Sequence, residues 1–455
     1  MPTAYTILFL LLILVAAATW IIPAGSYDYV DGVPVAGTYH PVEQNPQGVG
    51  DVLKAAFSGF YDAVDVCIFI LMVGGFLGVV MKTGAVDAGV ANIIRLLGGR
   101  EKWLIPILML LFGLGGTTYG MWEETMAFYP LLIPVFLAAG YDAVVGISVI
   151  LLGAGAGVIA STVNPFATGI AAGFAGVSLG EGIVLRLLEW VAFEAAAIWF
   201  VMAYAAKVKK NPSKSVVGVG AGKIQVSMDQ QVPFTAKRKV IMALFTLTFL
   251  IMVYAVVPFD EMGLPLPALG WWFPELSALF LVAGVVIGLI DRMSEEELVE
   301  IYVAGCADLL GVAFIIGISR GITVLMNDGA ITDTVLHWGE QALSGAGAIS
   351  FTLLVFALYL PLTILIPSSS GLATLSIPIV APLGKFAGVG GDLVVTAFQS
   401  ASGLVNIITP TAAVVMGALA LGHVPYDRWV KYVWKLILWF LLLALAFLVA
   451  GVLLG

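Results

Sequence analysis

Long apolar stretches without charge limit what this chain can fold into more than any other feature of its sequence. Among them are 5–22, 104–120, 240–257 and 436–454. Each is close to the length of about 20 apolar residues with which a helix crosses a bilayer. Hydrophobic residues make up 61% of the chain and charged residues 11%, whereas soluble domains are about half apolar and a quarter charged. The sequence therefore predicts an all-α polytopic membrane protein.

The remaining composition excludes several other classes of protein. The only long polar stretches are 24–55 and 207–239, so no separate soluble domain is expected. The first apolar stretch lacks the basic start and the cleavage site of a signal peptide, which predicts a retained first helix. Cys67 and Cys306 both lie in apolar segments and indicate neither a disulfide framework nor a metal site. No basic patch points to nucleic acid.

The charged loops predict an orientation in the membrane. Loops rich in Lys and Arg stay in the cytoplasm, and 207–239 is such a loop, with seven lysines and one arginine. The basic regions 95–102 and 428–435 indicate the same side. The acidic loops 24–55 and 327–341 are predicted to lie outside, so the N-terminus is predicted to be cytoplasmic.

An internal repeat divides the chain. A shift of 245 residues places 69–86 on 314–331, and at the same shift Pro165 meets Pro410. A constant register over so long a stretch predicts a duplication. The predicted organisation is listed in chain order: a first half at 1–206 with repeat 1 at about 60–206, a cytoplasmic linker at 207–239, and a second half at 240–455 with repeat 2 at about 305–455.

The two repeats are predicted to be inverted relative to each other. An additional helix around 276–290 lets the second copy enter the membrane from the opposite side to the first. Inverted repeats that meet at broken helices near the bilayer midplane are typical of secondary transporters with alternating access.

Each copy contains two predicted interruptions of the helical pattern. In the first copy, the arms 103–116 and 125–139 are short for full spans and predict a re-entrant hairpin with Glu123 and Glu124 at its tip. The shift places that tip on Ser368–Ser370, which precede Gly371. A second break is predicted at Asn164 and its counterpart Thr409, each followed by proline. Irregular backbone at membrane depth is tolerated only where it is buried in protein or lines water, so the four breaks predict a substrate site.

Charges within the membrane are candidates for function because they are costly there. Glu123 and Glu124 could bind a cationic group of the substrate, carry a coupling proton or ligate a cation. Arg320 could hold a substrate carboxylate or neutralise a glutamate. Glu194 is a possible charge partner, with structural pairing as the alternative.

Five motifs in order give the chain a family resemblance. They are "YTILFLLLILVAAATWIIPAGSYD", "GMWEETMAFYPLLIPV", "GAGVIASTVNPFATGIAAG", "IPSSSGLATLSIPIVAPL" and "NIITPTAAVVMGALALGHVPYDRW". With them the chain resembles the YfcC/ArcD-like branch of the DcuC-type carriers, within the ion transporter superfamily. That branch includes basic amino-acid antiporters and C4-dicarboxylate carriers. The resemblance implies a prokaryotic inner-membrane homodimer with elevator-like movement.

The resemblance also implies which residues bind substrate and sodium, at the hairpin tips and helix breaks. Carried onto this sequence, these are Thr117, Thr118, Glu123, Glu124, Thr125, Ser161, Thr162, Asn164, Ser368, Ser369, Ser370, Gly371, Asn406 and Thr409. No firm metal site is implied beyond possible sodium sites, and the only cofactor would be Na⁺ or H⁺ as a coupling ion. One departure is Ser402, which stands where the family often has an acidic residue.

The leading hypothesis is a carrier for a small carboxylate-bearing solute, most of all an amino acid such as arginine exchanged for ornithine. The second hypothesis is a sodium- or proton-coupled carrier of C4-dicarboxylates or other carboxylates. A channel is a further alternative, distinguished by the absence of flux saturation. An intramembrane hydrolase using Ser368–Ser370 is a remote one, because the motifs of such enzymes do not occur.

Overall fold

The computed structural model describes residues 4–30, 33–86, 88–89, 92, 100–118, 120–178, 180–218, 233–256, 266–271 and 273–454. Helices dominate this part of the chain, which confirms the predicted all-α class. Five of the described helices are long and apolar enough to cross a membrane, namely Val64–Lys82, Phe273–Asp291, Glu295–Asp328, Ala348–Leu365 and Tyr426–Leu454.

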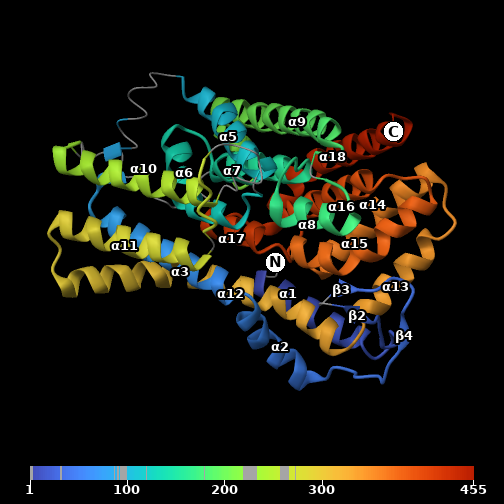
Figure 1. Ribbon diagram of the computed structural model, residues 1–455. Helices are drawn as coiled ribbons and strands as arrows, with labels where there is room; N and C mark the ends of the chain where they lie inside the picture. Colours follow the sequence, from blue (N-terminus) through green and yellow to red (C-terminus); the bar gives the residue numbers. More distant parts are fainter. Residues whose placement is uncertain are drawn as a thin grey trace.

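One group of helices gathers around the longest helix, α12 (Figure 1). Its members are α1 (Ala4–Ala18), α2 (Val49–Asp62), α3 (Val64–Lys82), α10 (Ala236–Val256), α11 (Phe273–Asp291) and α12 (Glu295–Asp328). Glycines bring the backbones close: a Cβ on Gly74 would lie 2.5 Å from the carbonyl oxygen of Gly305. We call these helices the α12 group.

Most of the other helices form a second group, packed around α7 and α16. Its members are α5 (Leu104–Thr118), α6 (Tyr129–Ala138), α7 (Ala143–Ile159), α8 (Ile170–Ala175), α9 (Ile183–Lys210), α14 (Ala348–Leu365), α15 (Ser369–Phe386), α16 (Gly391–Asn406), α17 (Ala413–Leu421) and α18 (Tyr426–Leu454). Short helical turns join them: η1 (Glu101–Trp103), η2 (Glu123–Phe128), η3 (Pro165–Gly169) and η4 (Pro212–Lys214). We call this the α7–α16 group.

Equivalent helices of the two copies lie against each other in opposite directions. In α9 and α18, which begin at Ile183 and Tyr426, the ring of Phe193 contacts that of Phe440 and the ring of Phe200 contacts that of Tyr432. The residue number rises along one helix as it falls along the other, so the pair is antiparallel. Inverted copies require such pairs, and the inverted relation of the whole halves stays a prediction.

The predicted interruptions coincide with the ends of helices. In the first copy α5 ends at Thr118 and α7 at Ile159; in the second, α14 ends at Leu365 and α16 at Asn406. Pro165 begins the turn η3 rather than ending α7, because proline fits the first turn of a helix, where no backbone N–H is needed.

Two of the predicted loops differ in the structure. The acidic segment 327–341 is wrong as a loop, because α13 (Thr332–Leu343) occupies most of it. At the linker, α9 continues to Lys210 and α10 begins at Ala236, so both helices extend into 207–239. The predicted basic turn at 95–102 lies partly outside the described residues, as does the linker segment 219–232.

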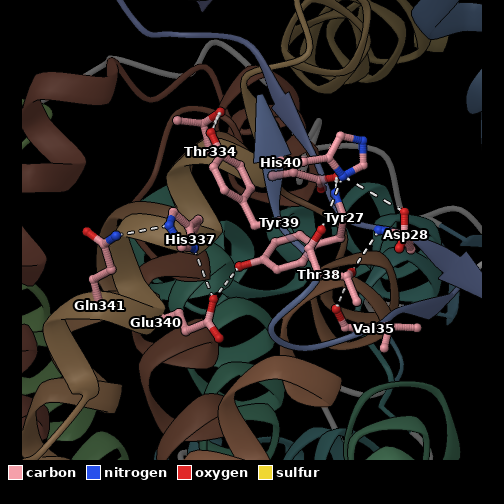
Figure 2. A network of polar contacts seen from close by, with 11 residues as sticks. Tyr27, Asp28, Val35, Thr38, Tyr39, His40, Thr334, His337, Glu340 and Gln341 are labelled. Atoms are coloured by element: carbon pink, nitrogen blue, oxygen red, sulfur yellow. Dashed lines mark hydrogen bonds and ion pairs between the residues drawn. The ribbon is translucent and has the colours of Figure 1, made fainter. Parts of the chain in front are cut away.

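The polar segment after α1 lies along α13. It forms two short antiparallel pairs, β1 (Gly25–Ser26) with β4 (His40–Pro41) and β2 (Tyr29–Val30) with β3 (Val33–Pro34). We call residues 24–48 the strap. Figure 2 shows its aromatic side chains against α13: Tyr39 stacks on His337 with 4.0 Å between ring centroids, and the Tyr27 hydroxyl donates to Glu340 at 2.8 Å.

Asp333 fastens the strap to α13. One of its carboxylate oxygens accepts the Tyr27 backbone N–H at 2.9 Å, and the other accepts the Tyr29 hydroxyl at 2.7 Å. Burial, followed by its bond to Glu340, raises the pKa of Tyr27 above its ordinary value. Tyr27 therefore keeps its proton and remains a donor over the physiological pH range.

Asp333→Ala is expected to loosen the strap without unfolding the helices. Two donors in a mostly buried place lose their acceptor, which costs about 1–3 kcal/mol and corresponds to a roughly 5- to 150-fold rise in the opening of the segment. Hydrogen exchange at the Tyr27 amide measures this rise. Asp28→Ala is the matched control, because the Asp28 side chain is exposed and its contact with His40 is long, at 3.9 Å. Equal exchange in both variants would contradict the role of Asp333.

Candidate functional site

A small cavity lies where the two groups of helices meet, at the first hairpin tip. Its volume is about 40 Å³, which is room for water or a small ion rather than for an amino acid. Polar or tip residues that line it come from distant parts of the chain: Trp122 and Glu123 from the first tip, Ser319 and Arg320 from α12, Pro367 from the second tip, and Asn406 and Thr411 from the second break. We call it the tip pocket.

Two opposite charges line the tip pocket. Glu123 begins η2 at the tip of the first hairpin, and Arg320 projects from α12. The Arg320 Nε also lies 3.8 Å from the Asp62 carboxylate at the end of α2. Since Asp62 is more than half exposed, its pairing with arginine contributes little free energy. The guanidinium therefore has only a weak charged partner in Asp62, and it lines the pocket together with Glu123.

Glu124 has a different environment from Glu123. It is 5% exposed, and its carboxylate accepts the backbone N–H of Trp122 at 3.1 Å. Its neighbour Thr125 donates its hydroxyl to the Trp122 carbonyl at 2.5 Å. Both side chains thus bond to the backbone of the tip. Of the two glutamates only Glu123 lines the tip pocket.

The first hairpin tip is bonded to the first helix break. The Thr117 carbonyl accepts the Thr162 backbone N–H and the Thr162 hydroxyl, both at 2.9 Å, and the Thr117 hydroxyl donates to Ala160 at 2.8 Å. Asn164 packs so closely on Gly120 that a Cβ there would lie 2.4 Å from its amide nitrogen. Gly120 also has a φ of +79°, a conformation that favours glycine. Tip and break therefore form one polar joint.

The second tip and second break are less directly joined. The Ser368 hydroxyl caps α15 by accepting the Gly371 backbone N–H at 3.3 Å, and it lies 3.4 Å from the Ser370 hydroxyl. In the second break, the Thr409 hydroxyl bonds that of Thr411 at 2.8 Å. These bonds satisfy polar groups at helix ends. Ser368, Ser369 and Ser370 do not line the tip pocket, whereas the neighbouring Pro367 does.

Three buried neutral oxygen atoms lie at or near the two helix breaks. In the described residues, hydrogen-bond partners are missing for the hydroxyls of Ser161 and Ser402 and for the Asn406 amide oxygen. These hydroxyl and amide oxygens are all neutral. Ser402 stands where an acidic residue was expected, so that position adds no charge either. No group of three or more His, Cys, Asp or Glu gathers for a divalent metal anywhere in the described residues.

A much larger cavity of about 1100 Å³ separates parts of the α12 group from α6, α17 and the start of α18. Its walls include Val312 and Ile315 of α12, directly next to Ile316 and Ser319 of the tip pocket. Asp308 lies on one wall, and His423 and Asp427 lie on another. The larger cavity is wide enough for an amino acid and borders the tip pocket along α12.

Of the predicted residues, only Glu123, Arg320 and Asn406 line the tip pocket itself. The Thr118 hydroxyl donates to the Leu114 carbonyl of its own helix at 2.6 Å. The Glu194 carboxyl oxygens have no hydrogen-bond partner among the described residues and lie against Gly113, so its role as a charge partner stays a prediction.

Sequence reasoning missed five residues of the site: Trp122, Ser319, Pro367, Thr411 and Asp62. Trp122 stands directly before the two glutamates, and Thr411 directly follows the proline of the second break. Both positions indicated that the site extends beyond the charged residues of the tip and the proline of the break. Asp62 had none, because its position at a helix boundary has an adequate explanation in helix electrostatics.

Comparison with known proteins gives consistent relatives. The model of the DcuC family, described as C4-dicarboxylate anaerobic carriers, matches residues 1–453. An uncharacterised Haemophilus influenzae protein is 35% identical over 503 aligned residues, covering 99% of this chain and 97% of that protein. YfcC of Escherichia coli, provisionally named a basic amino acid antiporter, is 31% identical over 480, covering 95% and 92%.

Two solved transporter structures are more distant. The YdaH transporter of Alcanivorax borkumensis has a TM-score of 0.46 at 15% identity, with 98% of both chains covered. MtrF of Neisseria gonorrhoeae, from a class of antimetabolite efflux pumps, has a TM-score of 0.42 at 18% identity, covering 98% of this chain and 94% of that one. Likenesses this weak carry no argument about function.

Proposed function

This chain belongs to the DcuC family of carriers, and we propose that it is a secondary transporter that exchanges amino acids, with arginine and ornithine as the first candidates. As a member of a carrier family it is a membrane transporter and not an enzyme, so the alternative of an intramembrane hydrolase is wrong. The finer assignment rests on the tip pocket and receives support from the provisional name of YfcC.

One observation carries the proposal: Glu123 and Arg320 line the same pocket with opposite charges. A zwitterionic substrate offers a carboxylate to the arginine and an ammonium group to the glutamate. A dianion offers nothing to the glutamate and is repelled by it at close range. At about 40 Å³ the pocket has room for little more than water. A substrate that enters from the larger cavity would therefore widen the pocket and separate the two charges.

The proposed transport cycle moves the α7–α16 group against the α12 group, as in an elevator. The large cavity between parts of the two groups leaves room for such movement. Glu123 lies on the proposed moving side and Arg320 on the proposed stationary side. We further propose a homodimer in a prokaryotic inner membrane, with its N-terminus in the cytoplasm, since the basic loops favour this orientation.

A carrier of C4-dicarboxylates is the second candidate, and the family name favours it. It would require the charge of Glu123 to be cancelled by a proton or by sodium. The neutral oxygens of Ser161, Ser402 and Asn406 could bind sodium near the breaks. A dianion bound with sodium would then use Arg320 as its main partner.

Uptake of labelled arginine into proteoliposomes tests the proposal. The vesicles are loaded with ornithine, with malate or with buffer, each with and without an inward sodium gradient. Saturable uptake that internal ornithine stimulates would support the exchanger. Uptake of labelled malate without any arginine uptake would replace it by the dicarboxylate carrier. Uptake that does not saturate would indicate a channel.

A further inference from the structure

Glu194 is a buried carboxyl group that the tip pocket does not use. It lies near the middle of α9, is 2% exposed, and neither carboxyl oxygen has a hydrogen-bond partner in the described residues. A charged carboxylate in such a place, without a partner, loses its hydration and gains nothing in return. An ionisable residue within a membrane helix is for this reason a candidate for function.

The carboxyl group has a fitted place on α5. A Cβ on Gly113 would lie 2.4 Å from Glu194 Oε2 and 2.8 Å from its carboxyl carbon. Only a glycine leaves that space, so the group lies directly on the α5 backbone. Gly113 stands four residues before Thr117, whose carbonyl joins the first tip to the first break. Glu194 thus lies one helical turn behind the polar joint.

Among the described residues, the helices packed on α9 place no hydrogen-bonding group on the Glu194 carboxyl. On α16, which contacts α9 through Ser400, the titratable residue is Asp392, beside Gly182 at the start of α9. Neither α5 nor α7 contains a titratable residue. In α18, Phe440 lies beside Phe193 and marks the level of Glu194. The titratable residues of α18 all precede Phe440, and Tyr432 contacts Phe200 and Tyr204, farther along α9 than Glu194. They are Tyr426, Asp427, Arg428, Lys431, Tyr432 and Lys435. Beyond the end of α9, η4 adds Lys214.

The other charged groups of α9 near Glu194 have partners of their own. Glu189, five residues earlier, accepts the Ser400 hydroxyl at 2.8 Å, and Arg186 donates to the Glu181 carbonyl at 2.9 Å. Trp190 is different: it precedes Glu194 by one turn on the same face, and its indole N–H has no partner in the described residues. A neutral donor one helical turn away can donate to the Glu194 carboxylate when the proton leaves.

We propose that Glu194 is a proton-binding site that couples proton movement to transport. A proton fits better than a metal cation, because no other described oxygen is bonded to the group, and a cation such as sodium needs several oxygen ligands. One O–H bond forms on the carboxylate when a proton arrives from one side, and the same bond breaks when it leaves to the other. Each passage carries one proton and needs no further reactant.

The coupling of proton binding to transport rests on the proposed function, whereas the proton-binding site at Glu194 does not depend on it. Glu194 lies behind the arm that holds the first tip, so gain or loss of its proton changes the charge next to α5. The neutral carboxyl loses far less hydration on Gly113 than the ionised form does, so the ionised form favours movement toward Trp190 or water. Binding of a proton is in this way linked to the position of the tip.

Infrared difference spectroscopy of the purified full chain tests the site without any substrate. A protonated carboxyl absorbs apart from a carboxylate, and the expected result is a protonated band that disappears from acidic to alkaline buffer in the unchanged protein. Glu194→Gln should lack this band, and Glu181→Gln, at an exposed position before α9, should keep it. A Glu194 band that persists unchanged in alkaline buffer would overturn the proposal, as would the absence of any band assigned by Glu194→Gln.

Proteoliposomes with an internal pH-sensitive dye test the coupling. Glu194→Gln is expected to reduce substrate-dependent proton entry to less than about a tenth while exchange at equal pH continues, because glutamine has the shape of the neutral acid. Gly113→Ala, which displaces the carboxyl, should lower proton entry too. Unchanged proton entry in Glu194→Gln would overturn the coupling. Loss of all arginine flux in the unchanged protein would instead refute the proposed substrate, and the infrared result would stand.

Discussion

Glu123→Gln is expected to lower the transport efficiency, kcat/KM, for arginine by about 10- to 100-fold. The carboxylate lines the tip pocket opposite Arg320, and in the proposed function it binds the cationic end of the substrate. A hydrogen bond to a charged group contributes about 1.5–3 kcal/mol, which is roughly one to two powers of ten in affinity. Initial rates of arginine uptake into ornithine-loaded vesicles measure the loss.

Glu124→Gln is the matched control for this variant. The Glu124 carboxylate accepts the Trp122 backbone N–H, and a glutamine oxygen can accept the same hydrogen bond. The transport efficiency of this variant is expected to fall by less than about fivefold, since a neutral acceptor replaces a charged one and the hydrogen bond itself is kept. The reverse order, with Glu124→Gln inactive and Glu123→Gln normal, would contradict the geometry of the tip pocket.

The helix breaks could be predicted from sequence because each depends on local chemistry. The short arm before Glu123 indicated the end of α5, and the repeat transferred it to α14. The Pro165–Pro410 correspondence indicated breaks a few residues beyond the ends of α7 and α16. The roles of residues within a break were less accessible. Ser368 belongs to a run of serines that suggests a substrate site, yet its hydroxyl caps α15. Serine is among the preferred residues at that position, and the sequence does not separate the two roles.

The tip pocket itself could not be assembled from sequence. Glu123 and Arg320 lie about 200 residues apart in the chain, and only packing of α12 against the first tip brings them to one cavity. No local pattern encodes that approach, because it depends on glycine contacts between whole helices. The strap is similar: Tyr39 and His337 give no sign of each other in the sequence, although their rings stack. An acidic segment with few apolar residues also concealed α13.

Arg320→Gln is expected to reduce arginine exchange at least as strongly as Glu123→Gln does. In the proposed function the guanidinium holds the substrate carboxylate, and its loss also leaves Glu123 without an opposite charge in the pocket. Losing a hydrogen bond to the charged substrate carboxylate costs about 1.5–3 kcal/mol. Asp62→Asn is the matched control, because it removes only the exposed partner at 3.8 Å. That control should transport at nearly the normal rate.

The double variant Glu123→Gln with Arg320→Gln separates two roles for the arginine. If Arg320 only neutralised Glu123, removing both charges would restore much of the exchange; if both bind substrate, the double variant stays inactive. The substrate class follows from the same set. A zwitterion needs both charges, so both single variants fail. A dianion needs Arg320 alone, so Glu123→Gln would leave malate uptake intact or improve it, and that result would overturn the amino-acid assignment.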